Sequence, residues 1–266
     1  GWKNANADVN IVVSRLGLSS ILRNIITKKK TIIVFHNFDK NDGKSRLLKY
    51  YFHLLFFVLR FSSENKVSLV VVSPFFEKYF ISKFSKIYVM LFPNLFNTKY
   101  YSSFISTQKN KKKILLGQVS GKYSSDTFIL AQKLSKAGYK CFFCSLNKDD
   151  AGKFENFEVK HLPFEDYLKE MASSYCSVSL SGVNEGWPRM VHESILVGTP
   201  VIGFDKGGLG DLLRESNSYI VSNLEEAFEL ITNNKVDLKM SSEFLQRYDV
   251  SNTKLFLKPV IEFINK

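Results

Sequence analysis

The chain has 266 residues, of which 45% are apolar and 14% aromatic, and it carries 37 lysine and arginine residues against 25 acidic ones. Such a chain can bury a substantial core in one large or two modest globular domains. Its formal net charge of +12 attracts polyanions, anionic lipid headgroups and phosphorylated substrates. Because no nucleic-acid docking motif accompanies the charge, we expect no nucleic-acid partner.

The three cysteines indicate reduced, buried thiols rather than disulfides or a metal site. Their number is odd for a long chain, which favours a cytosolic compartment. Cys141 and Cys144 form a C-x-x-C pair inside a strand-like run, but no second pair completes a zinc site. We therefore expect core packing rather than metal or redox chemistry at these positions.

The sequence predicts neither export nor a membrane span. Residues 1–10 lack a basic start followed by an apolar run, which a secretory signal needs. The most apolar window, residues 47–61, is interrupted by Lys49, His53 and Arg60 and is shorter than the ~18–20 residues of a spanning helix. We interpret it as a helix of a domain core. The basic clusters of the chain leave open that it also rests a basic-aromatic face on a membrane.

Strand-like runs alternate with longer helical stretches, the pattern of parallel sheets covered by helices. The first series has predicted strands at 9–13, 31–36, 67–72 and 87–92 and predicted helices at 16–26, 46–61 and 74–84. Residues 99–113 are polar and basic with little apolar periodicity, and we interpret them as an interdomain linker. The second series has strands at 113–117, 139–146, 177–180 and 201–204 and helices at 125–137, 164–174 and 188–197. Two doubly wound domains would leave a crevice where the carboxyl ends of the strands meet.

The most informative segment, residues 181–200, follows one of the predicted strands of the second domain. Glu185 lies on the loop at the carboxyl end of that strand, and Pro188 stands where proline favours helix initiation. Gly198 stops the helix and Pro200 keeps it stopped. Free backbone N–H groups and the positive end of the helix dipole suit an anionic diphosphate at such a place.

Two glutamates in this segment have the chemistry of a sugar-nucleotide site. Glu193, about one turn inside the helix, can accept two hydrogen bonds from a ribose diol, and Glu185 can meet the sugar. An alternative is that Glu193 simply pairs with Arg189, four residues earlier on the same helix face, in a surface ion pair worth a few tenths of a kcal/mol. The succession of strand, turn, proline-started helix and Gly-Thr-Pro stop favours ligand binding.

The motif resembles the signature of the retaining GT-B glycosyltransferases of family four. Seven residues separate Glu185 from Glu193, and Gly198-Thr-Pro-Val-Ile-Gly and Asp205-Lys-Gly-Gly-Leu-Gly follow. Ser73-Pro74 is similar to the family's strand-ending Ser-Pro, and Phe92-Pro-Asn94 to its hinge motif. The resemblance is strong over residues 177–222 and loose elsewhere.

This resemblance implies an α/β fold of GT-B type with two Rossmann-like domains, the first one incomplete. Residues 1–108 would form a partial N-terminal acceptor-side domain, and residues 109–250 the C-terminal domain that binds the nucleotide sugar. Residues 251–266 would form a helix that crosses back to the first domain. Residues 7–14 resemble a strand from the middle of the usual first domain, so its opening strand and Gly-rich loop are expected to be absent.

The resemblance also assigns roles to residues of this chain. Glu193 would hold the ribose, and Glu185 would lie near the transferred sugar. His36, at the end of the predicted strand 31–36, matches a histidine placed against the donor sugar. We therefore expect His36 and Glu185 to be catalytic. The phosphates would be contacted by the loop between the glutamates, which comprises Gly186, Trp187, Pro188 and Arg189.

The chain departs from the family pattern where a cationic pair usually contacts the diphosphate. Gly117 is followed by Gln118 instead of arginine, and Lys122 is shifted by about one position from the usual lysine. We still expect Gln118 and Lys122 to lie at the donor site. Arg189, where the family often has an apolar residue, would either compensate on the diphosphate or form the ion pair described above.

The implied activity is transfer of a sugar, with retention, from a nucleotide-diphosphate sugar such as a UDP- or GDP-sugar. The acceptor would be a glycan or a lipid-linked glycan in surface polysaccharide, lipopolysaccharide or glycolipid biosynthesis. No cofactor or metal is expected, since no Asp-x-Asp pair follows a strand. The expected location is the cytoplasm, including the inner face of the cytoplasmic membrane. There the basic residues interleaved with aromatic ones, as at Lys49-Tyr-Tyr-Phe52 and Lys78-Tyr-Phe80, would favour adsorption to anionic lipid.

Other functions remain open at this point. The chain could be the nucleotide-sugar-binding subunit of a split or inactive transferase, with a partner subunit completing its first domain. A GT-B-like epimerase of sugar nucleotides is disfavoured, because little of the carboxylate and histidine set needed for proton abstraction is present. Turnover of a sugar nucleotide, as opposed to binding alone, separates these alternatives.

Overall fold

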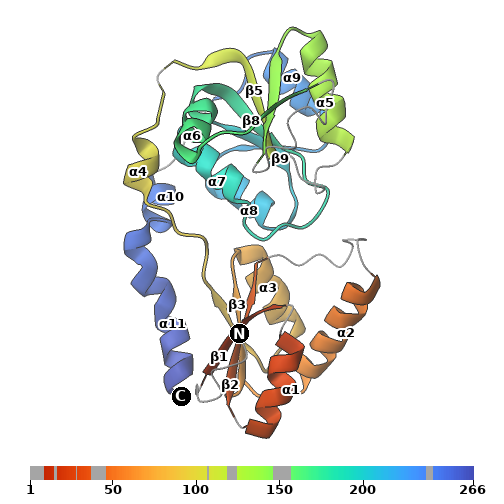
Figure 1. Ribbon diagram of the computed structural model, residues 1–266, viewed down its shortest axis with the longest axis vertical. Coiled ribbons are helices and arrows are strands. Elements are labelled where there is room, and N and C mark those ends of the chain that lie inside the picture. Colours follow the sequence, from red (N-terminus) through yellow and green to blue (C-terminus); the bar gives the residue numbers. More distant parts are fainter. Residues whose placement is uncertain are drawn as a thin grey trace. The chain divides into compact units, whose positions relative to one another are not determined.

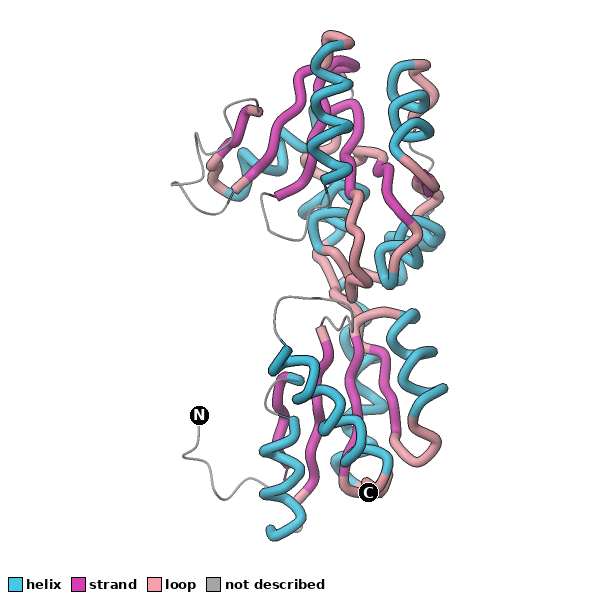
Figure 2. Tube along the Cα trace, turned by 90° about the vertical axis from the view of Figure 1, so that its right-hand side faces the viewer, coloured by secondary structure: helices cyan, strands magenta, loops and turns pink. Residues whose placement is uncertain are grey.

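The computed structural model describes residues 9–14, 17–27, 29–36, 46–106, 108–118, 125–145, 157–237 and 242–266. The chain divides into two compact units. The first unit comprises Gly1–Asn94 and Ser251–Lys266, and the second comprises Leu95–Val250. Each is an α/β unit in which helices cover a parallel sheet (Figure 1; Figure 2).

The first unit is built on a four-stranded sheet in the order β1-β2-β3-β4, with every neighbouring pair parallel. Its strands are β1 (Val9–Val13), β2 (Lys30–Phe35), β3 (Val67–Val71) and β4 (Tyr88–Leu91). Its helices are α1 (Gly17–Thr27), α2 (Arg46–Arg60), α3 (Pro74–Lys83) and α11 (Thr253–Asn265). Ser73 caps α3 by accepting a hydrogen bond from the Phe76 N–H at 3.3 Å. The sequence therefore places a Ser-Pro helix start directly after β3.

The two faces of this sheet are covered by different parts of the chain. On one face an aromatic core joins the sheet to α2 and α3, with the rings of Phe35 and Phe80 centred 4.7 Å apart. Helix α11 covers the other face (Figure 1). Its buried Val260 and Phe263 pack on apolar side chains of the strands. The Lys30 ammonium donates to the carbonyls of Phe263 and Ile264, at 3.1 and 2.9 Å, near the carboxyl end of α11. The last helix of the chain is thus part of the first unit.

The second unit has a six-stranded parallel sheet in the order β10-β9-β8-β5-β6-β7. Its strands are β5 (Asn110–Gln118), β6 (Lys140–Cys144), β7 (Glu158–Lys160), β8 (Ser174–Ser179), β9 (Val201–Phe204) and β10 (Tyr219–Val221). Its helices are α4 (Thr98–Ser102), α5 (Ser125–Lys136), α6 (Phe164–Ser173), α7 (Arg189–Leu196), α8 (Gly207–Glu215), α9 (Leu224–Thr232) and α10 (Ser242–Arg247). The strand order reverses between β5 and β8, and ligands of doubly wound sheets bind at the carboxyl ends of such a pair.

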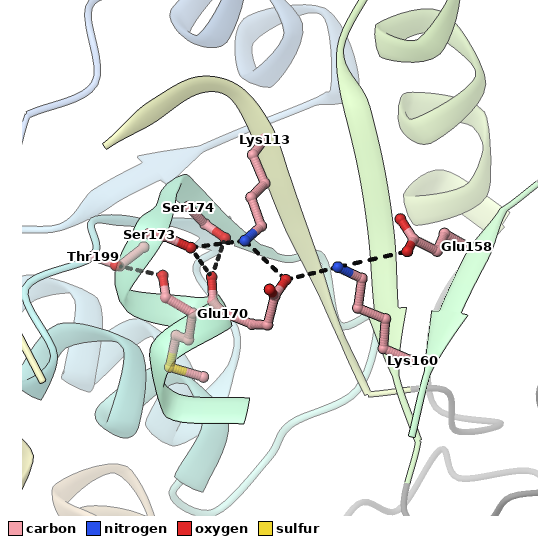
Figure 3. Close-up of polar contacts among 8 residues, drawn as sticks. Lys113, Glu158, Lys160, Glu170, Ser173, Ser174 and Thr199 are labelled. Carbon is pink, nitrogen blue, oxygen red and sulfur yellow. Dashed lines mark hydrogen bonds and ion pairs between the residues drawn. The ribbon is translucent and has the colours of Figure 1, made fainter. Parts of the chain in front are cut away.

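The segment that we interpreted as a linker, residues 99–113, belongs to the second unit. It contains most of α4 and the first part of β5, and the units divide earlier, after Asn94. Lys99, Lys111 and Lys112 of the segment are exposed, whereas Lys109 and Lys113 are half-buried and hydrogen-bonded. The Lys113 ammonium lies 2.8 Å from Glu170 and 2.7 Å from the Ser173 hydroxyl, and Lys160 reaches the same Glu170 carboxylate (Figure 3). Because the aliphatic parts of lysine side chains can cover apolar surface, the first residues of β5 lack the apolar pattern by which a strand is recognised in a sequence.

The cysteines lie in the core, as predicted. Cys141, Cys144 and Cys176 are free and buried, and burial raises the pKa of Cys141 to about 12. Such a thiol stays protonated and unreactive near neutral pH.

No helix within the described ranges is long and apolar enough to cross a membrane.

Candidate functional site

The candidate site lies in the second unit, at the carboxyl end of β8. The chain leaves β8 at Ser179, forms a loop through residues 180–188 and enters α7. β8 is the hydrogen-bonded neighbour of β5, whose carboxyl end is Gln118. The loop and the end of β5 therefore lie at the same edge of the sheet, at the point where its strand order reverses.

Glu185 is anchored through its backbone, which leaves its side chain available. Its carbonyl accepts a hydrogen bond from the Gly208 N–H at 2.8 Å, and it forms an isolated bridge with Gly207. Gly207 has φ +54°, and a Cβ there would come within 2.6 Å of the Glu185 carbonyl oxygen, so only glycine allows this approach. The half-buried Glu185 carboxylate accepts no hydrogen bond from any described residue.

The Gly-Gly segment after Asp205 is helical from Gly207 onward. It forms the first turn of α8, whose N-cap Lys206 makes no side-chain capping bond. Glycine is a poor helix former, but here its missing Cβ admits the Glu185 backbone. The family-like glycine pair therefore fixes the position of Glu185.

The start of α7 has free backbone donors. Pro188 is its N-cap, one residue earlier than the N1 position that proline prefers, and no side chain caps the helix. The first N–H groups of an α-helix have no partner within the helix, and an uncapped start leaves them available to an anion. Arg189 begins the helix and is 66% exposed, so its charge adds to the same electropositive end.

Among the described residues Glu193 is the only buried carboxylate, with 5% of its surface exposed. Its Oε1 accepts from the Tyr101 hydroxyl at 3.3 Å and from Arg189 Nη2 at 3.2 Å. Its Oε2 accepts from no described group. The ion pair considered in the sequence analysis therefore exists, but its acid is buried, unlike that of an ordinary surface pair.

Burial governs the protonation of this pair. Desolvation raises the pKa of Glu193, and the Arg189 charge opposes that rise. Desolvation, reinforced by the Glu193 charge, raises the pKa of Tyr101 to about 12, so its hydroxyl remains a donor near neutral pH. The carboxylate keeps one oxygen fixed by protein and offers the other to a ligand.

A histidine supports this helix from within. His192 is fully buried, and its Nδ1 accepts a hydrogen bond from Trp187 Nε1 at 2.9 Å. Aromatic rings of Phe96, Phe244 and Tyr248 surround it, with centroids 4.3 to 5.3 Å away. Desolvation lowers the pKa of His192 to about 3, so the imidazole is neutral. Its neutral acceptor nitrogen orients the Trp187 ring and thereby the loop before α7.

The structure brings together most of the predicted donor-site residues. Glu185, Gly186, Trp187, Pro188, Arg189 and Glu193 occupy one loop and the helix that follows it. Gln118 ends β5 at the same sheet edge, whereas Lys122 lies outside the described residues. His36 follows β2, is exposed, and belongs to the first unit. In the described parts of the chain, no group of three or more metal-ligating side chains could hold a metal ion.

Sequence reasoning missed Tyr101 and His192. Tyr101 lies in the segment that we interpreted as a linker. A short helix could have been expected there, because asparagine often caps helices and the Asn97 side chain accepts a hydrogen bond from the Tyr100 N–H at 3.0 Å. His192 follows the apolar Met190 and Val191 on a helix that ends in Ile195 and Leu196, and a polar side chain in such a buried helix signals a specific partner. Both signals were present in the sequence.

Comparison with solved structures identifies the architecture. Sucrose-phosphate synthase from Thermosynechococcus elongatus superposes with a TM-score of 0.69 at 13% identity, over 97% of this chain and 74% of that one. HepE from Anabaena, in complex with UDP and glucose, gives 0.71 at 14% identity, over 95% and 77%. TarM gives 0.66 at 14% identity, over 99% of this chain and 57% of that one. The fold is that of the GT-B glycosyltransferases.

Sequence comparison alone does not reveal this relationship. No protein-family profile matches the chain, and no curated protein matches it in sequence. The chain spans little more than half of the TarM chain and about three quarters of the other two. The shared architecture, with parallel sheets in both units, agrees with the fold predicted from the sequence.

Proposed function

We propose that the chain transfers a sugar from a nucleotide-diphosphate sugar to a glycan or lipid-linked acceptor, with retention, as in family four of the GT-B enzymes. The observation that carries this proposal is the Glu193 carboxylate. It is buried at the switch point of the sheet, with Oε1 bound by protein and Oε2 without a partner among the described residues. The two bonds to Oε1 offset part of the cost of burying this carboxylate, and a ribose diol supplies two further donors.

The surrounding groups fit the rest of such a donor. The uncapped start of α7 and the exposed Arg189 suit the diphosphate, and the unengaged Glu185 carboxylate is available to the sugar. Retention without a protein nucleophile would use the leaving diphosphate to deprotonate the acceptor on the same face. The protein would then contribute positioning and electrostatic stabilisation. His36 is proposed to act on the sugar, as the resemblance to the family implies.

Uracil is the proposed base, because two of the similar proteins were crystallised with uridine nucleotides. HepE was crystallised with UDP and with UDP-glucose, and Staphylococcus aureus TarM with UDP. The proposed setting is surface polysaccharide or glycolipid biosynthesis, without a metal or another cofactor.

The test combines binding and turnover. Purified protein is screened by thermal shift with UDP-, GDP-, ADP- and CMP-sugars, and hydrolysis or transfer is followed for those that bind. A ligand at a hundred times its Kd stabilises the folded state by about 2.7 kcal/mol. Glu193→Ala is expected to weaken UDP binding by about 1.5–3 kcal/mol, because a charge-assisted bond to the ribose is lost. Unchanged affinity in a folded variant would exclude the ribose role.

Glu185→Ala and His36→Ala separate catalysis from binding. Each should lower turnover far more than it weakens UDP binding, because both side chains are assigned to the sugar. Equal losses in the two assays would place them on the nucleotide instead. Tight binding of a sugar nucleotide without any turnover would favour the alternative function, a nucleotide-sugar-binding subunit of a split or inactive transferase.

A further inference from the structure

Helix α2 presents apolar side chains to solvent along its whole length. Five large apolar residues at spacings of three and four are between 52% and 81% exposed: Leu47, Tyr50, Leu54, Phe57 and Phe61. The opposite face of the helix is also apolar, because Leu55 and Leu59 are fully buried in the core of the first unit. The core therefore does not account for the outward stripe, and such patches mark interaction surfaces.

A cationic pocket adjoins the carboxyl end of this stripe. Arg60, Lys83 and Lys86 line a pocket of about 370 Å³, together with residues that include Ser82 and Ser85. Within the described part of the chain, none of the three cations forms an ion pair with a carboxylate. The Ser82 hydroxyl donates to the Tyr79 carbonyl at 2.8 Å, whereas the Ser85 hydroxyl can donate to an anion. The pocket thus combines three uncompensated positive charges with one available serine hydroxyl.

The stripe and the pocket are parts of one surface. Arg60 lies between Phe57 and Phe61 in sequence, and those two rings pack edge to face with centroids 5.1 Å apart. Residues 46–63 contain no aspartate or glutamate. Aromatic side chains beside basic ones are typical of helices that lie in the headgroup region of a bilayer.

We infer that this surface, the α2 stripe with the Arg60–Lys83–Lys86 pocket, docks the chain on a bilayer that contains anionic phospholipid. Leu54, Phe57 and Phe61 enter the acyl boundary, and a headgroup phosphate occupies the pocket. Charge complementarity selects this occupant, because a second copy of the chain would bring the same acid-free, cationic surface against itself. The inference goes beyond glycosyl transfer and does not depend on it.

Only one of the two basic-aromatic runs that were expected to adsorb to lipid exposes an aromatic ring of the α2 stripe. Of the two basic-aromatic runs identified in the sequence, Lys78-Tyr-Phe80 has its phenylalanine fully buried, so that ring is unavailable to lipid. In the other run Tyr50 is exposed, and it belongs to the α2 stripe. The helix interpreted as a core helix is therefore a core helix on one face and an unpartnered apolar helix on the other.

The experiment is co-sedimentation of the full chain with vesicles of phosphatidylcholine alone or mixed with phosphatidylglycerol. We expect binding to the anionic vesicles at low salt, release at roughly half-molar salt, and little binding to neutral vesicles. Lys83→Gln with Lys86→Gln should weaken binding about 25-fold, at about five-fold for each lysine near the surface. Leu54→Gln, Phe57→Ser and Phe61→Ser combined should weaken it at least about ten-fold.

Matched controls come from α11 of the same unit, where Leu255 is 65% exposed and Lys258 is exposed. Leu255→Gln and Lys258→Gln should leave vesicle binding unchanged, and melting curves should show that every variant folds. Equal loss in the controls, or equal binding to both vesicle types, would overturn the inference.

A dimer in light scattering that the apolar triple variant abolishes would assign the stripe to a second copy. Binding blocked by glycerol 3-phosphate but untouched by the triple variant would assign the pocket to a free phosphate compound.

Discussion

Helices α2 and α7 depart from ordinary amphipathic packing in opposite directions. In α7 seven of eight residues are buried, and these include the imidazole of His192 and the carboxylate of Glu193. In α2 the core takes one apolar face, and large apolar side chains remain exposed on the other. Buried polar groups and exposed apolar patches are the informative exceptions in globular proteins. The comparison agrees with the ligand site proposed at α7 and with the docking surface proposed at α2.

The largest expected difference between the two helices is in stability. Ile195→Ala in α7 should lower the free energy of unfolding by about 2–5 kcal/mol, because its fully buried side chain leaves a cavity. Leu54→Ala in α2 should change it by about 0.5 kcal/mol or less, because that side chain is half exposed. Urea unfolding of both variants makes the measurement. A large loss for Leu54→Ala would show that α2 is covered by protein in solution.

The second prediction concerns acid stability and His192. Burial lowers its pKa from the ordinary 6.5 of a histidine to about 3 in the folded protein, so the unfolded chain binds the extra proton first as the pH falls. The stability from the neutral imidazole is complete above pH 6.5 and is lost below it, by about 1.4 kcal/mol per pH unit. His192→Gln keeps an acceptor for Trp187 and should remove this slope in urea titrations between pH 6.5 and 4.5. An unchanged slope would mean that His192 is hydrated.

Much of the fold could be predicted from the sequence because its strands are apolar and uninterrupted. β1 and β9 begin and end at the predicted residues, and the loop-to-helix motif around Glu185 lies at a strand end as expected. β3 is buried along its whole length and β9 along most of it, and parallel strands buried on both faces leave little ambiguity in such runs. The short β7 and β10, with three residues each, carry too little pattern to be recognised.

What escaped prediction depends on contacts between distant segments. Tyr101 reaches Glu193 across 92 positions of the chain, and the Glu185 backbone rests on glycines of α8. A local sequence pattern shows neither of these two contacts. The exposed stripe of α2 was equally hidden, because an apolar run does not tell which of its faces is buried.

The third prediction isolates the contact between α4 and α7. Tyr101→Phe keeps the ring but removes the hydroxyl that fixes Glu193 Oε1, 3.3 Å away. If Glu193 binds the ribose, UDP affinity should fall by about 1 kcal/mol, roughly five-fold, whereas that of 2′-deoxy-UDP should fall less. Calorimetric titration of both nucleotides gives the discrimination, and Glu193→Gln in a double-mutant cycle tests the coupling. Equal losses for both nucleotides would indicate a general packing effect.

The smallest expected change in stability is at the exposed start of α7. Arg189→Gln removes an ion pair whose arginine is 66% exposed, and solvent screening limits the loss to about 0.5 kcal/mol. Ligand binding should be more sensitive, because Arg189 opposes the rise in the pKa of Glu193. Without it Glu193 takes up its proton at a higher pH, so UDP affinity should begin to fall at a higher pH during acidification. Uridine, which lacks phosphate, should share this pH shift but show no further loss. Equal losses for UDP and uridine near neutral pH would therefore exclude a diphosphate contact and leave Arg189 as the partner of Glu193 alone.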